Sequence, residues 1–367
     1  MSKLRARQWG LTFGELSTGA LNAIVDVMGV RVGHATLIHG EGLLQPGRGP
    51  VRTGVTVILP HAGNVYRSKV RAAVHTINGY GKALGFEQVR ELGVIESPIA
   101  LTNTLNIGLV ADALVEYAIR HNPDIGITTS SVNVVVGETS DAYLNDLQGR
   151  HVRAEHVFAA IEAATDSRVE EGNIGAGTGT TCFGWKGGIG TASRVLPIEL
   201  GSFTLGALVQ SNFGRPADLV IAGRPIGRWL TPANMPLNAA DHGSIMIVLA
   251  TDAPLSERQL HRMCVRAAAG VARTGSVYGH GSGDFVIAFS TVNRVEHDPT
   301  TMVTTEVRLM DEARVMEGLF HAVADSVEEA IINSLCAAET MIGRDGHVRY
   351  ALPMDTALAR SERDELR

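Results

Sequence analysis

The sequence is short of cysteines and aromatic residues, and each shortage excludes a class of protein. Only Cys182, Cys264 and Cys336 occur among 367 residues, and no CxxC pair or zinc-like spacing joins them. We therefore expect three small buried side chains in a reducing compartment, with neither disulfides nor a metal site. Aromatic residues make up 5% of the chain, which offers no platform for stacking nucleic-acid bases.

Long apolar runs and blocks of one charge are also missing. No stretch approaches the roughly 20 apolar residues of a membrane-spanning helix, and the basic residues at the start precede no apolar run of signal-peptide length. The net charge of −6 is dispersed, whereas a nucleic-acid binder usually carries a basic patch. These observations predict a soluble cytoplasmic protein with neither nucleic-acid nor membrane partners.

What is present is the composition of a packed globular protein. Hydrophobic residues make up 45% and charged residues 19% of a chain long enough for one large domain or two average ones. Apolar periodicity predicts helices over 82–93, 106–121 and 153–165. Capping boxes predict further helices from Ser256 to about Arg273 and from Ser326 to about Ile342.

Runs rich in β-branched residues predict the strands. We expect them within 23–33, at 52–59, near 125–137, 189–197 and 203–211, and in the apolar runs at 244–251 and 284–289. Strands buried on both faces, together with amphipathic helices, favour layers with sheets inside and helices outside. The segment from Asn234 to Gly243, after a proline-rich loop, looks like a long exposed connection.

The Gly-rich stretch GAGTG at 175–179 could belong to a dinucleotide site, which would make the chain an oxidoreductase. That motif requires an apolar strand before it and an amphipathic helix after it, and the sequence shows neither. We favour a loop in which glycines allow close backbone approach.

Ser244 is the first candidate nucleophile, because it follows Gly243 and opens an apolar strand. Its hydroxyl could attack the Gly243 carbonyl and, after hydrolysis of the resulting ester, leave a serine with a free α-amine. The pKa of such an amine is about 7.7–8.0, which suits a general base for the neighbouring hydroxyl. His242 could share a face with Ser244, although a loop histidine is the simpler interpretation. The local pattern alone equally fits a turn before a strand.

Other polar residues lie at predicted strand ends. Ser282 and Asp284 are two apart before an apolar strand, where they could orient a nucleophile. Asn212 ends a strand and could donate to an oxyanion. Glu138 leaves a strand and could hold a substrate ammonium. Taken singly, each also fits an ordinary turn or loop residue.

In this order the segments resemble the DmpA family, the L-aminopeptidase/D-amidase-esterases and β-peptidyl aminopeptidases. The resemblance covers nearly the whole chain and is carried by IVDVMGVRVGH, GPVRTGVTVILPH, ESPIALTNTLNIG, VVGETSDAYLND, VEEGNIGAGTGTTCFGWKGGIGTAS, LVQSNFG and GSIMIVLATDAPLS. It implies a four-layer αββα sandwich, as in N-terminal nucleophile hydrolases and ornithine acetyltransferases. It also implies self-cleavage into residues 1–243 and 244–367, no metal or other cofactor, and a homo-oligomer, commonly a tetramer of αβ units.

The resemblance also implies residue roles. Ser244 matches the nucleophile, Ser282 the serine beside it, Asn212 the oxyanion-hole donor and Glu138 the acid that holds the substrate's amino group. Asp284 stands where the family often has Glu, on a shorter arm. Ser140 stands where aminopeptidase members often have an aromatic residue, and Tyr143 lies three residues further on.

The resemblance therefore implies a self-processing serine aminopeptidase or amidase that acts on peptides, amides or esters with a free N-terminal residue. Three alternatives stay open at this point. An acyltransferase could share the fold, although ornithine acetyltransferases use Thr where this chain has Ser244. The chain could also be a binding protein that is never processed, or the dinucleotide-dependent oxidoreductase considered above.

Overall fold

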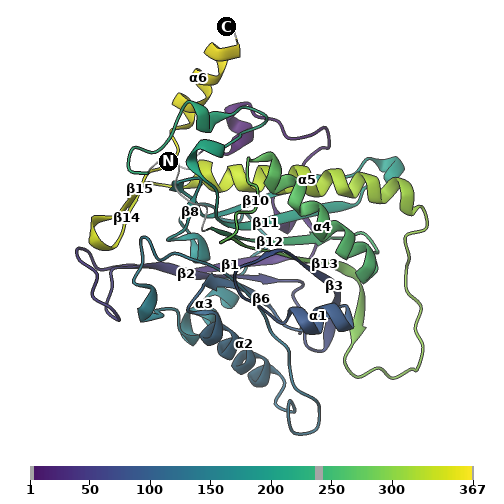
Figure 1. Cartoon of the computed structure of the whole chain (residues 1–367). Coiled ribbons are helices and arrows are strands. Elements are labelled where there is room, and N and C mark those ends of the chain that lie inside the picture. The colour runs from purple at the N-terminus through teal and green to yellow at the C-terminus, as the bar shows by residue number, and fades with distance from the viewer. Residues whose placement is uncertain (1–3, 236–242, 366–367) are drawn as a thin grey trace.

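Two β-sheets lie face to face between two layers of helices in the computed structural model, which describes residues 4–235 and 243–365 (Figure 1). The predicted αββα architecture is thus confirmed. The first sheet has the strand order β1–β2–β6–β7–β4, with bounds Arg31–His39, Val51–Leu59, Ile99–Asn103, Val135–Thr139 and Ala83–Leu84. The second sheet has the order β10–β11–β12–β13–β3–β5, with bounds Ile189–Val195, Thr204–Asn212, Ser244–Thr251, Gly283–Glu296, Ser68–Gly79 and Val94–Ile95.

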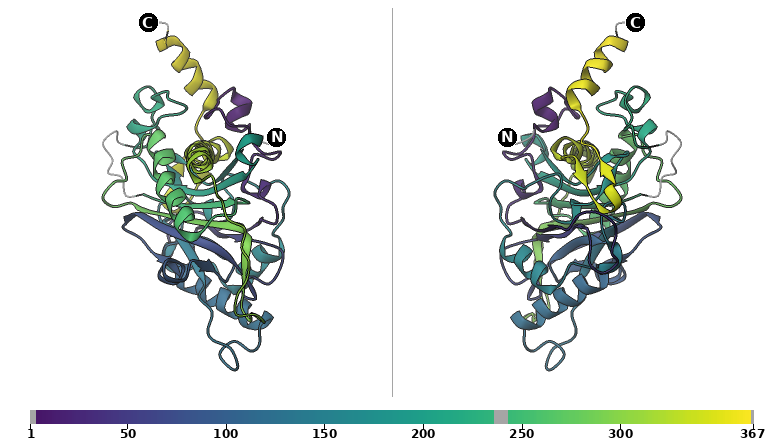
Figure 2. Two further views of the ribbon diagram at one scale, coloured as in Figure 1. Left: turned by 90° about the vertical axis from the view of Figure 1, so that its right-hand side faces the viewer. Right: turned by 90° about the vertical axis from the view of Figure 1, so that its left-hand side faces the viewer.

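The helices cover the outer faces of the sheets. The helices α1 to α6 have bounds Phe86–Leu92, Ile107–His121, Ala154–Glu162, Glu257–Arg273, Glu312–Ala337 and Met354–Glu365. The first sheet packs against α2 and α3, and the second against α4 and α5, as the views in Figure 2 also show. Four short strands lie outside the sheets, with bounds Thr181–Cys182 (β8), Trp185–Lys186 (β9), Met341–Ile342 (β14) and Val348–Arg349 (β15), and they pair as the hairpins β8–β9 and β14–β15. No helix among the described residues is both long enough and apolar enough to span a membrane.

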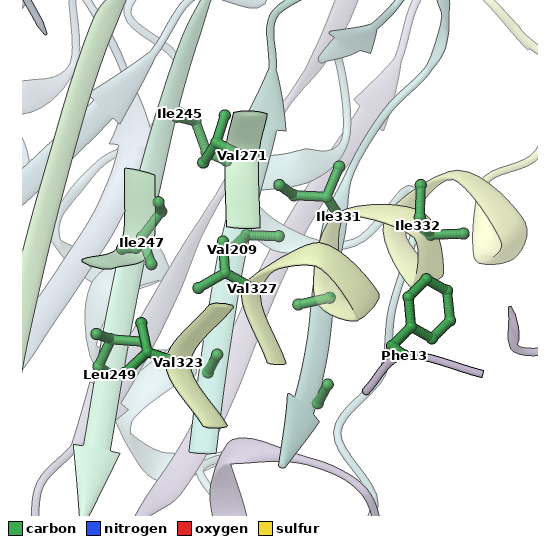
Figure 3. Packing of buried hydrophobic residues seen from close by; sticks show 14 of the residues in the cluster. Phe13, Val209, Ile245, Ile247, Leu249, Val271, Val323, Val327, Ile331 and Ile332 are labelled. Atoms are coloured by element: carbon green, nitrogen blue, oxygen red, sulfur yellow. The ribbon is translucent and has the colours of Figure 1, made fainter. Parts of the chain in front are cut away.

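The apolar run of strand β12 is continuous because both faces of the strand are buried. Alternate side chains of a strand point to opposite faces of the sheet. Ile245, Ile247 and Leu249 pack under the helices, where Figure 3 shows them beside α4 and α5, whereas Met246 and Val248 pack between the sheets. Burial of each of these side chains contributes roughly 1.5–3 kcal/mol.

The capping box predicted at Ser326 is wrong. Helix α5 begins fifteen residues earlier, where the Asp311 carboxylate accepts the Arg314 backbone N–H, and it ends at Ala337. Ser326 and Glu329 lie buried in the middle of this helix. Glu329 forms a buried ion pair with Arg194 of β10 at 2.7 Å, so its position reflects tertiary contacts and not a helix start. The capping box at Ser256, by contrast, is confirmed, since Ser256 and Gln259 bond each other's backbone.

Several strand predictions need correction. Residues Ile24–Asp26 form a 3-10 helix, so the strand expected within 23–33 begins only at Arg31. The strand expected from residue 125 begins at Val135. Both β3 and β6 were missed, although β3 pairs with β13 in the second sheet. Such segments become strands because they pair with neighbouring strands in the folded sheet, since their own apolar pattern is too short or too interrupted to predict a strand.

The Gly-rich stretch packs against strands, as expected for close backbone approach. A methyl group on Gly177 would lie 2.4 Å from the Ile189 nitrogen, and one on Gly179 would lie 2.2 Å from the Arg52 carbonyl oxygen. The cysteines also match the prediction, because all three lie in the described residues, are buried and form no disulfide.

Candidate active site

Ser244 opens β12 at an edge where three strands meet. The register pairs Ser244 with Asn212 on the antiparallel strand β11 and with Gly283 on the parallel strand β13. The N-terminal ends of β12 and β13 therefore lie beside the C-terminal end of β11. Ser244 is 8% exposed, so its side chain is almost completely buried. The sheet topology thus brings together residues that the sequence presents as separate motifs.

The peptide bond before Ser244 is held by its neighbours. The Gly243 carbonyl oxygen accepts a hydrogen bond of 3.1 Å from the Gly283 N–H. A methyl group on Gly243 would lie 2.3 Å from the Phe213 Cα and 2.5 Å from the Asn212 carbonyl oxygen. Only glycine fits this position without a backbone shift, because real Cβ contacts are never that short. The carbonyl is therefore both polarised by a donor and unshielded by a side chain.

Asn212 is oriented by a residue that sequence reasoning missed. The Thr181 backbone N–H donates to the Asn212 Oδ1 at 2.9 Å. The side-chain oxygen is thereby engaged, which leaves the NH2 group as the end that can donate to another acceptor. No sequence signal links Thr181 with Asn212, because the contact arises only when β8 packs beside β11.

Ser282 and Asp284 form a buried pair at the start of the strand beside Ser244. The Ser282 hydroxyl donates to the Asp284 Oδ1 at 2.7 Å, and both residues are 1% exposed. Asp284 is paired in register with Ile245, the residue after Ser244. The aspartate therefore reaches Ser282 despite its shorter arm compared with glutamate.

Glu138 comes from the facing sheet, near the C-terminal end of β7. It is 4% exposed and accepts a hydrogen bond of 3.0 Å from the Lys82 backbone N–H. A methyl group on Gly81 would lie 3.3 Å from both the Glu138 Oε1 and the Gly283 Cα, so the carboxylate lies on the β13 side of Ser244. The Lys82 ammonium also lies 3.4 Å from Oε1 and is half exposed, which shows that the carboxylate can receive an ammonium.

Gln210 is a second residue that sequence reasoning missed. It is fully buried, and its side-chain nitrogen lies 2.9–3.0 Å from the Thr139 hydroxyl and from the carbonyl oxygens of Thr102 and Ala176. Thr139 follows Glu138, and Gln210 lies two residues before Asn212. The contact therefore ties the two sheets together directly beneath the candidate site.

A cavity of about 340 Å³ adjoins Gly243 and Asn212. Both Ser140 and Tyr143 line it, together with Arg349. The Tyr143 ring stacks on His347 at 4.4 Å between centroids. His242, which the sequence presented as a conceivable partner of Ser244, lies outside the described residues.

The four-layer sandwich, with a serine at the start of a central strand, places the chain in the class of hydrolases with the N-terminal nucleophile architecture. A model of peptidase family S58 matches residues 22–349. The chain belongs to this peptidase family, which confirms the resemblance to the DmpA group and identifies a hydrolase.

The chain matches its relatives over almost its whole length. Beta-peptidyl aminopeptidase BapA from Sphingosinicella microcystinivorans is 42% identical over 363 residues, covering 95% of this chain and 89% of BapA. The PH0078 protein from Pyrococcus horikoshii OT3 has a TM-score of 0.93 at 52% identity, covering 99% of this chain and 100% of that protein. The L-aminopeptidase D-Ala-esterase/amidase from Ochrobactrum anthropi, described as a prototype for the serine aminopeptidases, has a TM-score of 0.89 at 38% identity, and the match covers 99% of each chain.

Proposed function

We propose that this serine aminopeptidase or amidase cleaves its own chain between Gly243 and Ser244 and then uses Ser244 as the nucleophile. In the first step the Ser244 Oγ bonds to the Gly243 carbonyl carbon, the C–N bond breaks, and the hydroxyl proton passes to the new α-amine. Water then hydrolyses the ester, releasing the Gly243 carboxylate and regenerating the hydroxyl. The products are residues 1–243 and 244–367, which stay together as one αββα domain.

The same groups then act on a substrate with a free amino group. The Glu138 carboxylate holds the substrate's ammonium, and Ser244 attacks the carbonyl that follows it. The Asn212 NH2 group donates to the oxyanion, and the Ser244 α-amine takes the hydroxyl proton and passes it to the leaving amine as the substrate's C–N bond breaks. Water then hydrolyses the ester left on Ser244, which releases the substrate's first residue with a free carboxylate and restores the hydroxyl. The Ser282–Asp284 pair stabilises the ammonium that forms on Ser244. Each of these steps uses only groups of the chain itself and water.

The observation that carries the proposal is the hydrogen bond from the Gly283 N–H to the Gly243 carbonyl oxygen, at the edge where Asn212 pairs with Ser244. It supports an activated peptide bond beside a nucleophile and an oxyanion donor. The relatives' names support an acyl residue that is an α- or β-amino acid, so both kinds belong in the assay.

Assembly and location extend the proposal. We propose a homo-oligomer, a tetramer of αβ units as the resemblance to the DmpA family implies, to be tested by light scattering on the purified protein. A cytoplasmic location agrees with three buried cysteines that form no disulfide.

The first test is the intact mass of the purified protein beside its Ser244→Ala variant, with Ser131→Ala as an exposed-serine control. We expect two fragments from the wild type and the control, the smaller beginning at Ser244, and one uncleaved chain from Ser244→Ala. Hydrolysis of alanine and β-alanine p-nitroanilides should follow processing. A wild-type chain that stays intact on incubation would reject both the self-cleavage and the role of Ser244 as an N-terminal nucleophile.

A further inference from the structure

The cavity beside Gly243 contains a buried arginine whose charge the proposed mechanism does not use. Arg349 ends β15 and is 6% exposed. Its guanidinium carbon lies 3.3 Å from the centroid of the Tyr143 ring, so the cation is fixed against an aromatic face. Burial lowers the pKa of this guanidinium, although an arginine remains charged in proteins.

The partners of this cation are neutral. Within the described part of the chain its Nε donates to the Thr181 hydroxyl at 3.0 Å, a nitrogen lies 3.4 Å from the Val348 carbonyl oxygen, and Tyr143 supplies the remaining contact. No carboxylate is among them. A buried cation usually has an anionic partner, because desolvating an unpaired charge is costly. Because Arg349 also lines the cavity, its guanidinium can pair with an anion that binds there.

Thr181 connects Arg349 to the candidate oxyanion donor. Its backbone N–H holds the Asn212 side chain at 2.9 Å, and its hydroxyl accepts from Arg349 at 3.0 Å. Both contacts are made by the single residue Thr181. The Asn212 Oδ1 and the Arg349 Nε are therefore separated by at most about 10 Å. An extended peptide residue spans roughly 3.3–3.6 Å, so the cation lies within about three residues of the reacting carbonyl.

The two charges of the site lie on opposite sides of Ser244. Glu138 lies on the β13 side of Ser244, beside Gly81 and Gly283, whereas Arg349 lies on the β11 side, beyond Asn212. A substrate held by its ammonium at Glu138 and attacked at Ser244 would extend its leaving group toward Arg349. Opposite charges at the two ends match a short zwitterionic peptide.

We propose that Arg349 binds the free C-terminal carboxylate of a di- or tripeptide, so that the enzyme favours short peptides with an unmodified C-terminus. The proposal deepens the aminopeptidase function stated above and rests on it. Bidentate pairing of a guanidinium with a carboxylate supplies both affinity and orientation. Tyr143 and Thr181 act as positioning residues that fix the plane of the fork.

The test compares Ala-Ala and β-Ala-Ala with the same peptides carrying a C-terminal amide, measured as released alanine or alaninamide by mass spectrometry. We expect kcat/KM to be roughly 10- to 100-fold higher for the free carboxylates in the wild type, as for a charge-assisted hydrogen-bonded pair. In Arg349→Met this ratio should fall close to one, and Arg349→Lys, which keeps the charge without the fork, should give an intermediate ratio. The wild-type ratio needs no variant and remains decisive if Arg349→Met fails to fold.

The other possible results would reject either the carboxylate site or the aminopeptidase function. Equal rates for free and amidated peptides in an active wild type would overturn the carboxylate site and leave the aminopeptidase function intact. A processed wild type that hydrolyses none of these peptides and no p-nitroanilide would reject the proposed function itself. If Asp p-nitroanilide is preferred over Ala p-nitroanilide and Arg349→Met abolishes that preference, the arginine binds an acidic first residue, and its assignment to the leaving group is wrong.

Discussion

Replacing Gly243 by alanine should slow self-cleavage without unfolding the protein. The φ angle of Gly243 is outside the left-handed region, so alanine can adopt the backbone conformation. The obstacle is steric, because the added methyl group would lie 2.3 Å from the Phe213 Cα and 2.5 Å from the Asn212 carbonyl oxygen. Both are backbone atoms at the end of β11 and cannot rotate away.

The size of the effect follows from the shift that relieves this contact. Either the peptide bond or the end of β11 must move by roughly 1 Å to reach a normal separation, and overpacking of this kind costs about 1–3 kcal/mol. A 1 Å displacement of reacting groups lowers a rate by about 100-fold. We therefore expect the half-time of cleavage to lengthen by about 10- to 100-fold.

The assay follows the disappearance of the intact chain by mass spectrometry after purification, with circular dichroism to confirm folding. Gly108→Ala is the matched control, because a methyl group there meets nothing within 4 Å and should leave the half-time unchanged. Cleavage of folded Gly243→Ala at the wild-type rate would refute the reasoning that contact with β11 sets the geometry of the scissile bond.

Three further predictions concern the site and its support. Asn212→Ala should lower kcat for alanine p-nitroanilide by about 10²–10³-fold, as for the loss of an oxyanion donor, and a loss below tenfold would count against that role. Glu138→Gln should raise KM for the same substrate by roughly 10- to 100-fold, because an amide cannot pair with an ammonium, and an unchanged KM in steady-state kinetics would remove Glu138 from the ammonium site. Burial lowers the pKa of Lys186 to about 7 from 10.5, so between these pH values the unfolded chain binds the proton that the folded chain has lost. The unfolding free energy of the uncleaved Ser244→Ala chain should therefore rise with pH over this interval by at most about 1.4 kcal/mol per pH unit. In urea denaturation, the unfolding free energy should rise less with pH when the Ser244→Ala chain also carries Lys186→Met. An equal rise in both chains would show that Lys186 does not cause the pH dependence.

The sequence by itself determined the elements whose signal is local. The apolar run after Ser244 predicted β12, because a strand buried on both faces needs no polar positions. The capping box at Ser256 predicted the start of α4, because its hydrogen bonds join residues three apart. The same pattern at Ser326 failed, since Glu329 pairs with Arg194 on another element. A local sequence pattern predicts the structure correctly only where the residues of the pattern bond to one another in the folded protein.

The tertiary structure alone decided how the site is assembled. Ser244, Asn212 and Gly283 become neighbours only through strand register, and Glu138 joins them only because the first sheet stacks on the second. The contact between Thr181 and Asn212 and the place of Arg349 in the cavity leave no trace in sequence periodicity. The physical reason is that the ends of strands carry no period of their own, so what lies beside them depends on which strands pair and in which direction.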